Sequence, residues 1–164
     1  MSKSPTLSKR RQVRERVLQA LYAHEQSGDE AQHVIATILA PAFRDEPIYL
    51  RFAEKLFLHS ADTREAADAL IAAHTENWDI ARLALTDRLV LRMAIAEMLH
   101  FEDIPPKVSL NEAVEVAKAF GTDKSGAFVN GVLDAVLRDL RAAGRLHKTG
   151  RGLVDQTPGA PAAG

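Results

Sequence analysis

Apolar residues recur at intervals of three and four along almost the whole chain, and this periodicity constrains the fold more than any other feature of the sequence. Such spacing gathers apolar side chains on one face of a helix, where a neighbouring helix can bury them. The sustained apolar–polar alternation of a half-buried strand is absent. We therefore expect an all-α fold, a helical bundle built around the most apolar segment, residues 83–101.

Residues that start and stop helices divide this pattern into seven expected helices. Gly28, Pro41 and Gly144 are placed to end helices, and Pro47 can occupy a first turn. Ser109 and Glu112 have the spacing of a capping box, with the serine as N-cap. The expected helices cover about residues 9–26, 30–40, 47–57, 62–75 (with Ser60 as an alternative start), 83–101, 109–120 and 127–143.

These helices form one expected domain with a tail at each end. We assign residues 1–7 to a disordered N-terminus and residues 8–145 to an all-helical domain. Residues 146–164 are dominated by Gly, Pro and Ala and are expected to be a disordered tail.

The composition argues against most catalytic and metal-based functions. The chain has no cysteine, which excludes disulfides, thiol catalysis, Fe–S clusters and cysteine-ligated zinc. Its six histidines are scattered without an H-E-x-x-H pair, and no Gly-rich phosphate loop is present. We expect no enzyme activity, no metal and no cofactor. No apolar run of about 18 residues and no signal peptide is recognisable, which favours a cytoplasmic protein.

The net charge of −1 hides a strongly uneven distribution. Residues 1–16 contain six bases and one acid, and residues 138–151 contain five bases and one acid. Residues 17–137 contain ten bases and nineteen acids. Basic ends on an acidic body indicate a polyanion-binding surface beside surfaces that serve other partners, although solubility alone is an alternative reading.

Two groups of residues are candidates for binding RNA. Arg10, Arg11 and Arg14 lie at the start of the first expected helix, and arginine binds phosphates bidentately and stacks on bases. Phe120 and Phe128 flank a loop that carries Lys124, and aromatic rings beside a base are typical of single-stranded RNA recognition. For each phenylalanine, packing in the core is the alternative.

A second group of polar residues is a candidate for binding a protein partner. Asp87, Arg88 and Arg92 interrupt the most apolar helix, and the two arginines share a face at i, i+4. An internal ion pair or a solvated stripe would explain them equally well. Tyr22 belongs either to the core, with its hydroxyl at the rim, or to a partner surface.

Three blocks of sequence resemble the transcription antitermination factor NusB family over about residues 9–140. Asn77-Trp78, before the fifth expected helix, also resembles the family. The blocks are RRQVRERVLQALY at 10–22, DRLVLRMAIAEM at 87–98 and PPKVSLNEAVEVAKAFGTDKSGAFVNGVLD at 105–134, of which the last is the most specific.

The resemblance implies a bundle of seven helices in two subdomains and a noncatalytic role in antitermination. It implies binding of boxA RNA as a heterodimer with a small-subunit ribosomal protein, NusE, in a complex with NusA, NusG and RNA polymerase. A homodimer of the free protein is possible within the family. The family's RNA contacts match Arg10, Arg11, Arg14, Phe120 and Phe128. Its partner surface matches the residues Tyr22, Asp87 and Arg92, beside which Arg88 lies.

The match departs from the family at two places, and two other functions stay open. Gln12 interrupts an arginine run, which lowers the expected phosphate count, and Lys124 stands where some relatives carry an acid. Similar helical domains form the RNA-binding part of some ribosomal RNA cytosine methyltransferases, but such a reading needs a catalytic domain with a reactive cysteine. A purely structural bundle with solvated charges is the other alternative.

Overall fold

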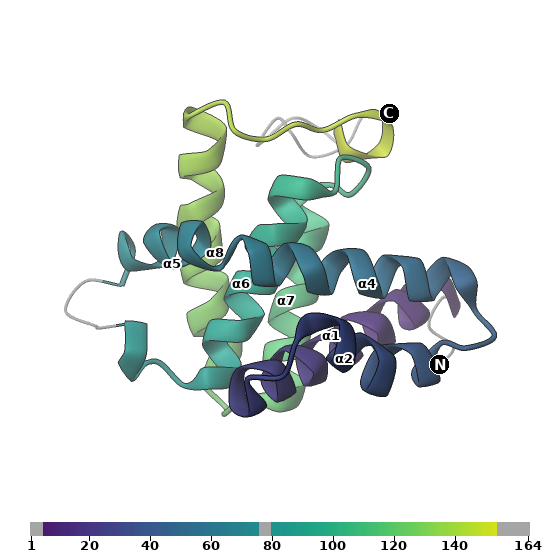
Figure 1. Cartoon of the computed structure of the whole chain (residues 1–164). Helices are drawn as coiled ribbons and strands as arrows, with labels where there is room; N and C mark the ends of the chain where they lie inside the picture. Colours follow the sequence, from purple (N-terminus) through teal and green to yellow (C-terminus); the bar gives the residue numbers. More distant parts are fainter. Residues whose placement is uncertain (1–4, 76–79, 154–164) are drawn as a thin grey trace.

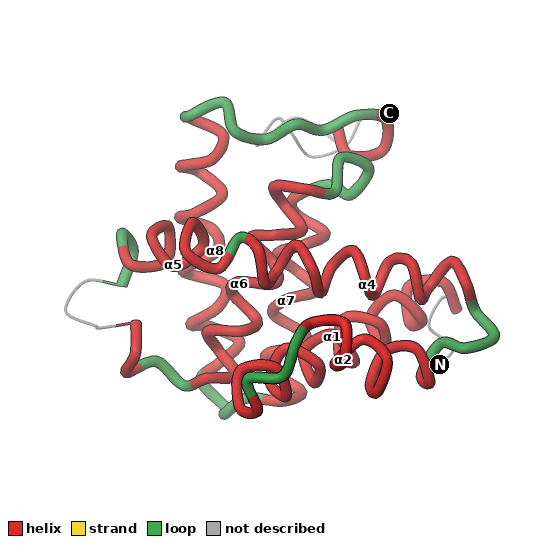
Figure 2. The backbone as a smooth tube through the Cα atoms, viewed as in Figure 1, coloured by secondary structure: helices red, strands yellow, loops and turns green. Residues whose placement is uncertain are grey.

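The computed structural model describes residues 5–75 and 80–153, and within these ranges it contains helices and loops but no strand (Figure 2). The all-α prediction is therefore confirmed. The Asn77-Trp78 pair lies outside the described residues. The main helices are α1 (Pro5–Ser27), α2 (Ala31–Val34), α3 (Ala40–Ala42), α4 (Pro47–Asp62), α5 (Arg64–Ala72), α6 (Leu85–His100), α7 (Pro106–Phe120) and α8 (Ser125–Ala142).

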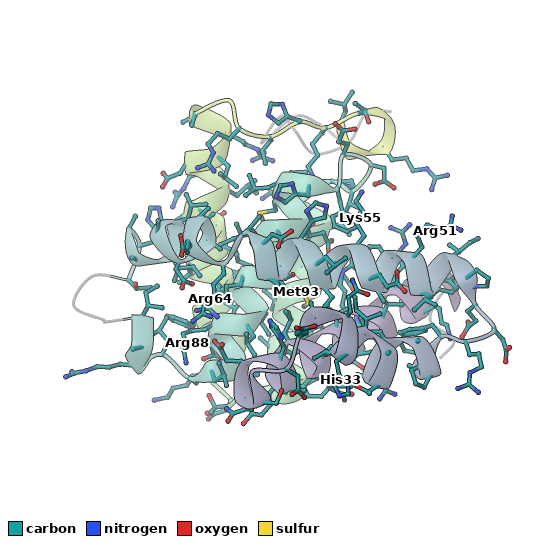
Figure 3. All side chains as sticks on the ribbon, in the orientation of Figure 1. His33, Arg51, Lys55, Arg64, Arg88 and Met93 are labelled. Atoms are coloured by element: carbon teal, nitrogen blue, oxygen red, sulfur yellow. The ribbon has the colours of Figure 1, made fainter. Side chains whose placement is uncertain are left out.

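The helices fall into two groups that share α6. In Figure 1, α4 runs across the molecule together with α1, whereas α7 and α8 run roughly at right angles to them. Helix α6 packs against both groups, contacting α1 and α4 on one side and α7 and α8 on the other. Met93 of α6 lies at the centre of the molecule in Figure 3 and is fully buried, as are Leu91 and Ile95. The segment predicted to be central is thus the shared core helix.

The second expected helix is continuous but irregular. Between α2 and α3 the chain forms a π-helical turn, η1 (Ile35–Leu39), so residues 31–42 make one helical stretch. Counted in this way, the described chain has seven helices, as predicted. The helix includes Pro41 and ends one residue after it, at Ala42, close to the expected end. Proline lacks an amide hydrogen and crowds the preceding turn, and the wider π-turn just before it accommodates both effects.

The N-terminal boundary of the first helix differs from the sequence expectation. Helix α1 starts at Pro5, so residues 5–7 extend the helix instead of belonging to a disordered segment. Proline is well tolerated in a first turn, where its missing N–H has no helical acceptor. Residues 1–4 lie outside the described part of the chain.

The predicted capping box is wrong. Helix α7 begins at Pro106, one turn before Ser109, because a proline at the first helical position has the required φ already fixed. The hydroxyl of Ser109 instead donates to Glu97 Oε1 on α6 at 2.8 Å. Glu112 accepts hydrogen bonds from Arg11 on α1. Both residues therefore join helices to one another and do not cap their own.

The prediction of a disordered tail is also wrong for residues 146–153. This stretch folds back over the turn between α6 and α7, where Lys148 Nζ donates to the carbonyl oxygen of Phe101 at 2.7 Å. The amide of Thr149 donates to the carbonyl oxygen of Glu102 at 3.0 Å. A Cβ on Gly152 would lie 1.8 Å from that same oxygen, so the close approach requires glycine. Residues 154–164 lie outside the described part.

Candidate nucleic-acid interface

Arg14 does not face solvent. Its side chain points from α1 into the core and is 2% exposed. Nε and Nη2 donate to the two carboxylate oxygens of Glu97 at 2.9 and 2.7 Å, and Nη1 lies 3.6 Å from Glu112 Oε1. Burial alone lowers the pKa of the Arg14 guanidinium, but the charge and hydrogen bonds of Glu97 outweigh it and leave the pKa raised. Direct phosphate contact by Arg14 was a wrong expectation, because buried charges need partners and this one has two.

Arg11 occupies the border between core and surface. Its Nε and Nη2 donate to Glu112 Oε1 and Oε2 at 3.0 and 2.7 Å, a bidentate pair that joins α1 to α7. The hydrogen bonds that Arg11 donates to Glu112 are the main reason that the pKa of Arg11 is raised. The side chain keeps 21% of its surface exposed. Two of the five guanidinium N–H groups are engaged in these bonds, so the outer edge can still donate to a phosphate.

Arg10 is the least engaged arginine of the predicted cluster. Its guanidinium lies over the ring of Phe52 on α4, 4.9 Å from the ring centroid, and the residue is half-buried. This cation–π contact orients the group without neutralising its charge. On the same helix, Lys9 pairs with Glu46 at 2.7 Å. The N-terminal surface is therefore less cationic than the sequence count indicates.

The second predicted group surrounds the turn between α7 and α8. Phe120, the last residue of α7, is 41% exposed, far more than a core phenylalanine. Gly121 follows it, and a Cβ there would lie 2.3 Å from Ser125 Oγ. That hydroxyl accepts a hydrogen bond from the amide of Thr122 at 2.9 Å. The tight turn fixes the position of the exposed ring of Phe120 and presents Lys124 to solvent.

The structure brings Phe128, Lys124 and Asp87 to one pocket of about 340 Å³. Phe128 is partly buried and packs against the core, so core packing, the alternative to RNA binding, is partly correct for this residue. Asp87, in the first turn of α6, was predicted as a partner residue, whereas the other two were predicted to bind RNA. The two predicted surfaces therefore adjoin. The lining consists of Arg82, Leu83, Ala84, Asp87, Thr122, Lys124, Ser125 and Phe128.

The remaining partner candidates have different surroundings. Tyr22 is exposed on α1 and is available to a partner. Arg92 is 4% exposed, and it donates to Asp68 at 2.7 and 2.9 Å and to Glu25 at 3.3 Å, so its internal ion-pair alternative is the correct one. Arg88 lies on the same side of the molecule as Arg64 in Figure 3 and is half-buried.

Sequence reasoning missed the acidic partners of the arginines. Glu97 was counted only as part of an apolar helix, and Glu112 was explained as a cap. The signal that could have found them is their spacing on helices α6 and α7, where each stands among residues of the buried face. An acid on a buried face requires a cation, and α1 has several.

Three further observations bound the chemistry of the described chain. Lys148 is buried and holds the C-terminal segment, whereas Arg138, Arg145 and Arg151 of the basic C-terminal stretch are exposed. In residues 5–75 and 80–153 no group of three His, Asp or Glu side chains is placed to hold a metal ion. No helix in these ranges combines the length and apolar character needed to cross a bilayer.

Comparisons with known proteins find relatives in both sequence and fold. The model of the NusB family matches residues 11–138. A transcription antitermination protein NusB of Salinibacter ruber is 48% identical over 148 residues, covering 90% of this chain and 92% of that protein. The structure of T. maritima NusB superimposes with a TM-score of 0.73 at 34% identity, covering 84% of this chain and 94% of the other. A NusB solved with NusE and double-stranded RNA has a TM-score of 0.72 at 24% identity, covering 83% and 99%.

Proposed function

The chain belongs to the NusB family of noncatalytic transcription antitermination factors, and we propose that it binds boxA RNA as a heterodimer with NusE in ribosomal RNA operons. In this proposal the heterodimer joins NusA, NusG and RNA polymerase and suppresses premature termination. The choice of ligands follows the structural neighbour that was solved with NusE and double-stranded RNA. Single-stranded RNA fits better here, because stacking on an exposed ring requires an unpaired base.

One observation carries the RNA proposal: the available arginine and the exposed aromatic ring are fixed to the same helix. Arg11 is bound to Glu112 in the middle of α7, and Phe120 ends that helix. Phe120 lies eight positions after Glu112, an axial rise of about 12 Å along the helix. One strand of RNA can therefore place a phosphate against the guanidinium groups of Arg10 and Arg11 and a base against the ring of Phe120.

The charges of this surface predict a modest dependence of RNA affinity on salt. Arg10, Arg11 and Lys124 are the cations that we propose for phosphate contact, while Arg14 is buried and Lys9 is paired. For single strands the logarithm of the binding constant falls with the logarithm of salt concentration by about 0.7 per phosphate contact. We expect a slope of about −2 for the free protein.

We propose that NusE binds beside the RNA, on a surface that contains Tyr22, Asp87 and Arg88. Arg92 supports this surface from inside, because it holds Asp68 and Glu25 and has little surface of its own. The acidic middle of the chain would attract a basic ribosomal protein. Asp87 lines the same pocket as Phe128 and Lys124, so protein and RNA contacts meet there.

The experiment is a fluorescence-anisotropy titration of boxA RNA at several salt concentrations, with and without NusE. Phe120→Ala is expected to weaken binding by about 1–3 kcal/mol, the range for one stacked base. Arg10→Gln combined with Arg11→Gln is expected to weaken binding and to reduce the slope against salt. Asp87→Lys is expected to impair co-purification with NusE while leaving the helical fold intact.

Arg16→Gln is the matched control for the arginine variants. Arg16 is exposed on the same helix, and its guanidinium donates to Gln19 at 3.1 Å. The control removes one positive charge from α1, against two in the double variant, at a position outside the proposed contact. Equal effects of the control and the double variant would refute a defined contact at Arg10 and Arg11, and binding unaffected by either would refute RNA recognition by this helix.

A further inference from the structure

Four alternating charges form a row from the surface to the core. Arg11 pairs with Glu112, Glu112 also lies near Arg14, and Arg14 pairs with Glu97. Ser109 completes the row by donating to Glu97. The row joins α1, α7 and α6, and of its four charged residues Arg11, at the outer end, has by far the most exposed side chain.

The place of Glu112 in this row is unexpected on electrostatic grounds. A carboxylate within hydrogen-bond distance of an RNA-facing guanidinium repels the phosphate that the guanidinium attracts. Glu112 is not needed to neutralise Arg14, which already has a bidentate partner in Glu97. Its two short bonds are instead to Arg11. Because the Glu112 carboxylate repels an RNA phosphate, we expect it to have another role at this site. Its two bonds to Arg11 indicate that role, since they fix where the guanidinium lies.

We propose that Glu112 is a positioning residue for RNA binding. It holds the Arg11 guanidinium against α7, the helix that ends at Phe120. The inference rests on the proposed function, since it concerns how that RNA site is ordered. An unrestrained arginine loses side-chain freedom when it binds a phosphate, whereas Arg11 is already fixed in the free protein. Ordering one long side chain in advance is worth about two- to tenfold in Kd.

The test compares two acids on α7 that differ in this role. Glu112→Gln and Glu115→Gln each remove one negative charge from the helix. Glu115 is partly exposed and pairs with Lys118 at 3.2 Å. Its charge also acts on Arg11, but the two hydrogen bonds of the Arg11 guanidinium are to Glu112. Charge alone predicts tighter RNA binding for both variants. Positioning predicts that Glu112→Gln binds boxA RNA two- to tenfold more weakly, while Glu115→Gln binds equally well or more tightly.

A double-variant cycle separates positioning from a loss of fold. In the Arg11→Gln background, adding Glu112→Gln is expected to change the RNA Kd by less than about twofold, because the residue to be positioned is gone. An equal loss in both backgrounds, or tighter binding by Glu112→Gln alone, would overturn the proposal. Thermal unfolding of each variant is followed in parallel.

Arg11→Lys keeps the proposal testable if Glu112→Gln does not fold. Lysine keeps the charge but cannot make the bidentate pair with Glu112, so we expect RNA binding two- to tenfold weaker than wild type, as for Glu112→Gln. Binding at the wild-type level would overturn the proposal. Wild-type protein that does not bind boxA RNA, or Arg11→Gln without effect, would instead refute the proposed function itself.

Discussion

Replacing Arg14 by methionine gives the sharpest test of the structure, because the sequence places this arginine in an RNA site and the structure places it in the core. Methionine fills a similar volume but donates no hydrogen bond. Glu97 would keep the hydrogen bond from Ser109 and lose both bonds from Arg14. A buried ion pair broken on one side costs about 3–5 kcal/mol, a large part of the roughly 5–15 kcal/mol that stabilises a typical domain.

The assay is urea and thermal unfolding followed by circular dichroism. For a chain of this size the loss corresponds to a decrease in Tm of roughly 6–20 °C. The control Arg16→Gln removes an exposed arginine from the same helix and is expected to change stability by less than about 0.5 kcal/mol. Arg14→Met combined with Glu97→Met removes both charges and should recover most of the loss.

The reasoning would be refuted if Arg14→Met were as stable as the Arg16→Gln control. Arg14 would then be a surface residue, and its pairing with Glu97 would be incorrect.

Three other predictions concern titration and the C-terminal segment. Burial lowers the pKa of Lys148 from 10.5 to about 8. Between pH 8 and 10.5 the unfolded chain therefore binds more protons than the folded chain, and the free energy of unfolding should rise with pH. This rise, measured by urea unfolding, should be absent in Lys148→Met. Burial likewise lowers the pKa of His100, which stacks on His59 at 4.2 Å, so stability should fall as the pH drops below about 6.5, and less so in His100→Phe. Gly152→Ala places a methyl group against the carbonyl oxygen of Glu102 and should expose the C-terminal segment to limited proteolysis, with unchanged cleavage arguing against its docking.

The sequence predicted the helices because their signals are local. Apolar spacing marks the buried face of each helix, and the segment around Met93 is apolar on nearly all sides, as a helix shared by two groups must be. The exposure of Phe120 followed from its place at a helix end beside a glycine. Each of these conclusions depends on residues within one or two turns.

The pairing of charges was not predictable because it depends on distant contacts. Arg14 and Glu97 are 83 residues apart, and Arg11 and Glu112 are 101 apart. An arginine at a helix start has the same local sequence whether it faces RNA or a buried acid. The docking of Lys148 escaped prediction for the same reason, since its acceptor is a backbone oxygen 47 residues away.

The docked segment also extends the folded unit beyond α8. The family match stops at residue 138, inside α8, yet ordered contacts continue to Leu153. A truncation after Gly144 would remove Lys148, whose ammonium group donates to the carbonyl oxygen of Phe101. It would also leave the turn between α6 and α7 open to water. A shortened protein cut to the family boundary should therefore be less stable than the whole chain, and a purification tag belongs beyond residue 153, not directly after α8.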